Sequence, residues 1–242
     1  MDKKIKMLDT FAGIGGFSYA AHKLVGGFET KQFIEIDPFC QKILNKHFPN
    51  VPIHDDIRTF SAISGQYDVI CGGFPCQSIS VAGNRAGITE ESRSGIFYEL
   101  MRVIRMVRPR FVVLENVAAI LNNGLDIVLG ELSQAGYDAE WSIISANTLG
   151  ACHRRSRWWC VAYPNSKGLQ GQMFNEMERE IWSQSNSRRL NPNWRSYVSK
   201  PILPRGSDGL SNRVDRTKSL GNSVVPACAA IPLKRVLDLY NQ

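Results

Sequence analysis

The stretch Ile5–Phe17, IKMLDTFAGIGGF, decides the fold. Its first six residues form a short apolar run that predicts a buried strand, and the glycine-rich half leads into a predicted helix at 16–25. Glycines at such a junction let the backbone turn sharply and approach a ligand, and the helix amino terminus offers free N–H groups. Similar turns also occur as plain structure, so the stretch predicts a strand–turn–helix unit without fixing a ligand.

The same alternation continues through the first two-thirds of the chain. Strands are predicted at 5–10, 31–36, 67–71, 111–114 and 140–145, with a sixth candidate at 158–163, and helices at 16–25, 38–47, 94–107, 124–136 and 227–239. Alternation of this kind predicts an α/β fold with a doubly wound, mainly parallel sheet. Ligands of such folds bind at the carboxyl ends of the strands.

Charge is distributed unevenly along the 242 residues, whose formal net charge is +7. Residues 1–150 hold 14 basic and 16 acidic side chains, whereas residues 151–242 hold 15 and 6. A basic final third indicates a nucleic-acid partner, although a basic solvated surface gives the same count. Apolar runs fall short of the ~20 residues of a membrane span, and the six cysteines form no Cys-x-x-Cys pair. We therefore expect a cytoplasmic protein without a metal site.

Carboxylates follow the glycine-rich turn at positions that suit a nucleoside. Glu35 stands about 20 residues after Gly13 and Gly15, where an acid can accept hydrogen bonds from both ribose hydroxyls. Asp55 or Asp56 could pair with an adenine amino group. The turn lacks the Gly-x-Gly-x-x-Gly form that binds a pyrophosphate, so S-adenosylmethionine is the expected ligand. A loop carboxylate or a helix cap is the alternative interpretation of each acid.

Three features at predicted strand ends can be joined into one chemistry. Cys76, in GGFPCQSIS (72–80), is held between glycine and proline and is a candidate nucleophile. Glu115 leaves a buried strand, where a carboxyl has a raised pKa and can handle a proton. Arg155 and Arg157 share one face of the extended chain and could hold a carbonyl oxygen or a phosphate. Taken singly, these residues also fit a packed cysteine, a cap and a solvated basic face.

The ordered motifs resemble those of the DNA (cytosine-5)-methyltransferase family, in the form of a compact bacterial or phage-type member. The resemblance covers residues 5–160 and 208–239, and it implies the class I S-adenosylmethionine-dependent methyltransferase fold. The motifs that carry it are DTFAGIGGF, EID, DDI, GFPCQSIS, SRSGIFYEL, ENV, HRRSR and LGNSVVP.

By this resemblance, the chain methylates carbon 5 of a cytosine that is flipped out of double-stranded DNA. Cys76 is implied to attack carbon 6 of the ring, and Glu115 to protonate or hydrogen-bond ring nitrogen 3. Arg157 is implied to bind the ring carbonyl oxygen, and Arg155 to support the catalytic loop.

The resemblance also implies a set of cofactor contacts, of which the last two require the terminal helix to pack back beside the first strand. The implied contacts are Phe11, Gly13, Gly15, Glu35, Ile36, Asp56, Ile57, Pro75, Ile96, Asn222 and Ser223.

The expected organisation is a catalytic and cofactor-binding domain at 1–163, a small irregular target-recognition lobe at 164–205 and a return to the catalytic domain at 206–242. This lobe is shorter than the family norm, which predicts a short or relaxed target site in a monomer, or help from another chain. The candidates for DNA contact are Arg188, Arg189, Trp194 and Arg195. One departure is His153, which stands where the family usually has Gln.

Two alternatives remain at this stage: a tRNA cytosine-5 methyltransferase on the same fold, and a catalytically silent DNA-binding relative. Retention of Cys76, Glu115 and Arg157 speaks against the second. A dehydrogenase would not explain the basic final third. The sequence leaves the target bases open, and it does not separate a restriction–modification enzyme from a phage or solitary one.

Overall fold

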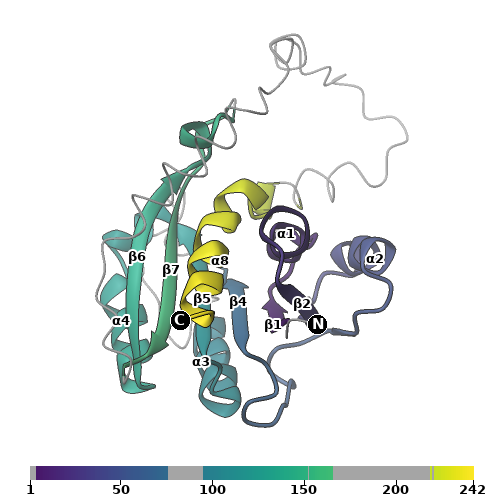
Figure 1. Ribbon diagram of the computed structural model, residues 1–242, viewed down its shortest axis with the longest axis horizontal. Coiled ribbons are helices and arrows are strands. Elements are labelled where there is room, and N and C mark those ends of the chain that lie inside the picture. The colour runs from purple at the N-terminus through teal and green to yellow at the C-terminus, as the bar shows by residue number, and fades with distance from the viewer. Residues whose placement is uncertain (1–3, 76–94, 152, 166–218, 220) are drawn as a thin grey trace.

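The computed structural model describes residues 4–75, 95–151, 153–165, 219 and 221–242. Its centre is a seven-stranded sheet in the order β3-β2-β1-β4-β5-β7-β6 (Figure 1). The strands are β1 (Ile5–Thr10), β2 (Phe28–Ile34), β3 (Ile53–His54), β4 (Val69–Gly73), β5 (Phe111–Val117), β6 (Tyr137–Ser145) and β7 (Ser156–Pro164). The strands β1 to β5 pair in parallel, while β7 is antiparallel to both of its neighbours. The predicted α/β fold with a mainly parallel sheet is confirmed.

Helices cover both faces of this sheet. They are α1 (Gly16–Tyr19), which continues into the π-helical η1 (Ala20–Val25), α2 (Pro38–His47), α3 (Ile96–Val107), α4 (Leu125–Gln134) and α8 (Pro226–Tyr240), with short 3₁₀ turns η3 (Ala118–Leu121) and η4 (Ala146–Leu149). Side chains of α1, η1 and α8 join one apolar cluster, and those of α3 and α4 join another on the opposite face. Figure 1 shows α8 in front of the sheet, on the same side as α1.

The apolar runs of the sequence become strands that are buried on both faces. In β5, Phe111 and Val113 pack in the cluster with α8, whereas Val112 and Leu114 pack in the cluster with α3 and α4. Successive side chains of a strand point to opposite faces, and a sheet covered by helices on both sides therefore reads as a continuous apolar run. This is why the run at 111–114 predicts a central strand.

Several predicted boundaries were wrong. The strand β2 begins at Phe28, not at residue 31, because Gly26 and Gly27 adopt φ of 82° and 79° and turn the chain into the sheet there. It ends at Ile34, not at residue 36, since Asp37 caps α2 by accepting from the Phe39 N–H at 2.9 Å. Two further features were not predicted: the two-residue strand β3 and the π-helical geometry of η1.

The terminal helix packs beside the first strand, as the cofactor contacts implied by the family resemblance require. Apolar side chains of α8 pack in one cluster with Ile5 and Met7 of β1. Val224, just before α8, approaches the start of α1 so closely that a Cβ added to Gly16 would lie 2.8 Å from the Val224 carbonyl oxygen. We refer to residues 221–225, which lead into α8, as the return segment.

Replacement of Gly16 by alanine is expected to displace the return segment. The added methyl group would overlap the Val224 backbone, so Gly16→Ala is expected to destabilise the protein by roughly 1–3 kcal/mol. Gly130→Ala is the matched control, because a Cβ at Gly130 in α4 meets nothing within 4 Å, and we expect it to stabilise by about 0.5–1 kcal/mol. Urea titrations of both variants measure the difference; equal stability of the two would contradict the close approach.

Among the described helices, none is long and apolar enough to cross a membrane.

Candidate functional site

A cavity of about 610 Å³ collects residues that follow β1, β2, β3 and β4, together with the end of β5, the start of β7 and the return segment. The predicted site residues that line it are Phe11, Gly13, Glu35, Ile36, Asp56, Ile57, Pro75, Ile96, Glu115, Arg155, Arg157 and Asn222. Carboxyl ends of parallel strands meet at one edge of the sheet, which is why residues so distant in sequence share one cavity. Gly15 and Ser223 are not among the lining residues.

Five predicted site residues lie outside the described residues: Cys76, Arg188, Arg189, Trp194 and Arg195. The described chain reaches Pro75, which lines the cavity, immediately before Cys76 in the sequence.

The turn after β1 opens toward the cavity with an unusual backbone. Phe11, Gly13 and Gly15 adopt φ of 53°, 55° and 86°, in the left-handed region that residues other than glycine rarely occupy. A Cβ at Gly13 would meet nothing within 4 Å, so the turn leaves open space beside its backbone. A strained non-glycine residue such as Phe11 is typical of functional sites.

Glu35 is fixed at the cavity wall by backbone donors. Its Oε2 accepts from the Gly13 N–H at 2.6 Å and its Oε1 accepts from the Asp37 N–H at 2.8 Å. Burial raises the pKa of Glu35, while the N–H donors at Asp37 and Gly13 oppose the shift. A carboxylate has about four acceptor sites, so Glu35 can still accept a hydrogen bond from a ligand. Next to it, the Ile36 side chain lines the cavity and is 64% exposed, an apolar surface available to a ligand.

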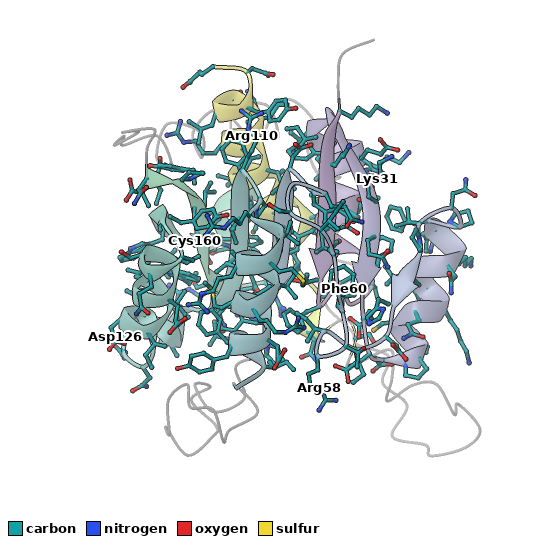
Figure 2. The ribbon with its side chains drawn as sticks, turned by 90° about the horizontal axis from the view of Figure 1, so that it is seen from below. Lys31, Arg58, Phe60, Arg110, Asp126 and Cys160 are labelled. Atoms are coloured by element: carbon teal, nitrogen blue, oxygen red, sulfur yellow. The ribbon has the colours of Figure 1, made fainter. Side chains whose placement is uncertain are left out.

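The Asp56 carboxylate already has a partner that the sequence analysis missed. The Arg58 side chain donates from Nε at 3.0 Å and from Nη2 at 2.7 Å, and the Arg58 N–H donates at 3.0 Å. Hydrogen bonds from Arg58 lower the pKa of Asp56. Both residues line the cavity, and Figure 2 shows the Arg58 side chain pointing outward from the ribbon. An arginine two residues after the acid was the available signal.

A second missed residue is Asp9, at the end of β1. Its Oδ2 accepts from the Ser18 hydroxyl at 2.6 Å and from the Ser18 N–H at 3.2 Å, which ties α1 to the sheet. Burial raises the pKa of Asp9 to about 7. Asp9 does not line the cavity. Its hydrogen bonds to Ser18 link the end of β1 to α1 and so support the glycine-rich turn between them.

Glu115 is held between β4 and β7 at the other end of the cavity. In the register of the sheet it stands opposite Gly73 of β4 and Trp159 of β7. Its Oε1 lies 3.0 Å from Nε of Arg157, and a Cβ at Gly73 would lie 3.1 Å from its Oε2. Burial raises the pKa of Glu115 to about 7, against the opposing charges of Arg157 and Arg155. A carboxyl with this pKa can exist in either protonation state near neutral pH.

The two arginines have different partners. Arg157 pairs with Glu115, whereas Arg155 donates from Nη1 to the Gly221 carbonyl and from Nη2 to the Ser223 carbonyl, both at 2.8 Å. The catalytic loop that Arg155 was predicted to support lies outside the described residues. His153, the departure from the family motif, is exposed.

The residues present fit S-adenosylmethionine. A buried carboxylate with free acceptor sites, an exposed isoleucine and an open glycine turn surround one end of the cavity, which suits a ribose joined to a flat apolar ring. Within the described ranges, no cluster of His, Cys, Asp and Glu could hold a metal ion.

The model of the C-5 cytosine-specific DNA methylase family matches residues 5–223. The Type II methyltransferase M.CviJI of Paramecium bursaria Chlorella virus IL3A is 35% identical over 160 residues, which are 65% of this chain and 42% of the viral protein. The Type II methyltransferase M.HpaII of Haemophilus parainfluenzae is 32% identical over 230 residues, which are 91% of this chain and 62% of that protein.

Solved structures share the fold. The Dnmt2 methyltransferase of S. pombe superposes with a TM-score of 0.60 at 22% identity, over 74% of this chain and 55% of that one. The chain spans less than half the length of the viral relative and 62% of the Haemophilus one. The family match covers all seven strands of the sheet and both ends of the cavity, and this chain belongs to the C-5 cytosine-specific DNA methylase family.

Proposed function

We propose that this protein methylates carbon 5 of cytosine in double-stranded DNA, with S-adenosylmethionine as the methyl donor and Cys76 as the nucleophile. The observation that carries the proposal is a single cavity with two chemically different ends. Glu35 and Ile36 follow β2, whereas Glu115 and Arg157 belong to β5 and β7; β1 and β4 lie between β2 and β5, so the two sets line different ends of the cavity. A cofactor and a base bound together in this cavity would meet between these ends.

The cofactor end recognises a nucleoside without a phosphate. Glu35 accepts the ribose hydroxyls with the acceptor sites that Gly13 and Asp37 leave free, and Ile36 packs on the adenine ring. Asp56 accepts from the adenine amino group while Arg58 holds its carboxylate in place. When bound, S-adenosylmethionine supplies a methyl group on a positively charged sulfur.

The other end binds the cytosine. Glu115 in its protonated form donates to ring nitrogen 3, which draws electron density from the ring and favours attack of the Cys76 thiolate on carbon 6. Once carbon 5 carries the methyl group, a base removes the proton on that carbon, the bond between Cys76 and carbon 6 breaks, and the thiolate leaves. Arg157 donates to the ring carbonyl oxygen. The ion pair of Arg157 with Glu115 holds both side chains in position before the base arrives.

The chain would be organised around this site as the sequence predicts. We propose a catalytic domain at 1–163 and 206–242 and a short target-recognition region at 164–205, in which Arg188, Arg189, Trp194 and Arg195 contact DNA. We propose that the protein acts as a monomer in the cytoplasm of a bacterium or an infected host. If the target site is long, another chain would supply DNA contacts beyond those of the short target-recognition region.

The pH dependence of turnover follows from the pKa of Glu115. The protonated fraction of Glu115 falls about tenfold per pH unit above its pKa of about 7, whereas the thiolate fraction of Cys76 rises until about pH 8.5, the ordinary pKa of a thiol. At saturating S-adenosylmethionine, kcat/KM for DNA reports the protein before the base binds, and we expect it to level off between these pH values and to fall about tenfold per pH unit above them. Asp9 shares a pKa of about 7 but does not line the cavity, so Asp9→Asn should keep the alkaline fall. A kcat/KM for DNA that stays flat up to about pH 10 would contradict the assigned role.

Transfer of a radioactive methyl group from S-adenosylmethionine separates the proposed function from its alternatives. We expect label in duplex DNA and none in transfer RNA. Label in transfer RNA alone would establish the RNA enzyme instead. If the protein binds cofactor and DNA but labels neither DNA nor transfer RNA, it is a catalytically silent DNA-binding relative.

A further inference from the structure

The Arg155 side chain joins two walls of the cavity that come from distant parts of the chain. It stands directly before β7, and its two terminal nitrogens donate to the carbonyl oxygens of Gly221 and Ser223, 66 and 68 residues further on. Both hydrogen bonds measure 2.8 Å. The two acceptors flank Asn222, which lines the cavity, so a single guanidinium spans this residue.

The return segment has a second close contact on its other side. The Val224 carbonyl oxygen approaches Gly16, and Ser223 Oγ donates to that same carbonyl at 3.1 Å. The segment therefore lies between the start of α1 and the Arg155 guanidinium. Without Arg155, the carbonyls of Gly221 and Ser223 would lose charged donors, which are the stronger class of hydrogen bond.

Arg157, two residues along, differs in its partner. It forms its ion pair with Glu115 at the base end of the cavity, and among the described residues its hydrogen bond is to the Ser156 carbonyl, not to the return segment. Arg157 therefore contacts the base end of the cavity, whereas Arg155 contacts the return segment.

We propose that Arg155 is a positioning residue for the cofactor: its guanidinium holds the return segment in the cavity wall and so places Asn222 against the bound S-adenosylmethionine. This inference rests on the proposed function, since it assumes that the cavity binds that cofactor. It assigns Arg155 to the cofactor end, in addition to any contact with the catalytic loop.

Binding of S-adenosylmethionine without DNA tests this role by isothermal titration calorimetry. Arg155→Ala is expected to raise the Kd about tenfold or more, because two charged hydrogen bonds that order the segment are lost. Arg105→Ala is the matched control, and its Kd should stay within about threefold of wild type because Arg105 pairs with Glu131 and does not line the cavity. An R155A protein that binds as tightly as wild type would overturn the inference.

A double-mutant cycle separates positioning from a general loss of structure. If Arg155 acts by placing Asn222, Asn222→Ala should weaken binding in the wild-type background but add less than about twofold in the R155A background. If the Kd of the double variant rises by the product of the two single fold-changes, Arg155 does not act through Asn222. Circular dichroism confirms that each variant is folded at the assay temperature.

Should R155A fail to fold, Arg155→Lys carries the comparison. Lysine keeps the charge but lacks the planar fork that reaches both carbonyls, so its Kd should rise by about threefold or more, and wild-type affinity would overturn the inference. Failure of the proposed function has a different signature, because the wild-type protein would then transfer no methyl group to duplex DNA, whereas the inference about Arg155 is judged by the Kd for S-adenosylmethionine alone.

Discussion

Replacement of Glu115 by glutamine is expected to lower kcat by about 10²–10⁴-fold while the Kd for S-adenosylmethionine stays near the wild-type value. The amide has the shape of the carboxyl but cannot transfer a proton. Glu115 lies beside Arg157 at the base end of the cavity, away from the Glu35 and Ile36 that line the cofactor end. Single-turnover kinetics with saturating cofactor would measure the effect on methyl transfer itself.

Glu140→Gln provides the matched control for the loss of a largely buried acid that pairs with an arginine. Glu140 of β6 pairs with Arg235 of α8 at 2.7 Å and accepts from the Tyr163 hydroxyl at 2.9 Å, and it does not line the cavity. Its replacement should lower the free energy of unfolding, since Arg235 becomes a buried charge without a partner carboxylate. At temperatures where it is folded, E140Q should retain kcat. Equal losses of kcat in E115Q and E140Q would remove the reason to assign a proton-handling role to Glu115.

Cys76→Ser is expected to abolish turnover, with a loss on the order of 10⁴-fold or more, the scale seen when a covalent nucleophile is removed. A hydroxyl is far less ionised than a thiol near neutral pH, so the attack on carbon 6 is lost. Cofactor affinity should change little. The assay is methyl transfer to duplex DNA beside a calorimetric Kd for S-adenosylmethionine; a C76S protein with full activity would rule out the covalent mechanism.

The fold could be predicted from sequence where the side-chain pattern is strong. The run at 111–114 is apolar on both faces and became β5, and the glycine-rich turn after Thr10 became the start of α1. The two-residue β3 was missed because two residues carry no periodicity. The antiparallel direction of β7 also left no local mark, since a buried strand reads alike in either direction.

The site shows the same division between side chains and backbone. Glu35, Glu115 and Arg157 were recognisable by residue type and position in the sequence, and they line one cavity. The Arg155 contacts were not, because their acceptors are main-chain carbonyls, which every residue possesses. For the Arg58 contact with Asp56, the sequence offered only the spacing of two residues, and it did not specify the backbone turn that brings the two side chains together.

Mapping of 5-methylcytosine tests the central claim most directly. Purified protein and S-adenosylmethionine would be incubated with a library of duplex DNA sequences, and bisulfite sequencing would locate the cytosines that resist conversion. The account predicts resistant cytosines within a common short sequence, and none with C76S. A folded wild-type protein that binds S-adenosylmethionine yet leaves every cytosine convertible would contradict it.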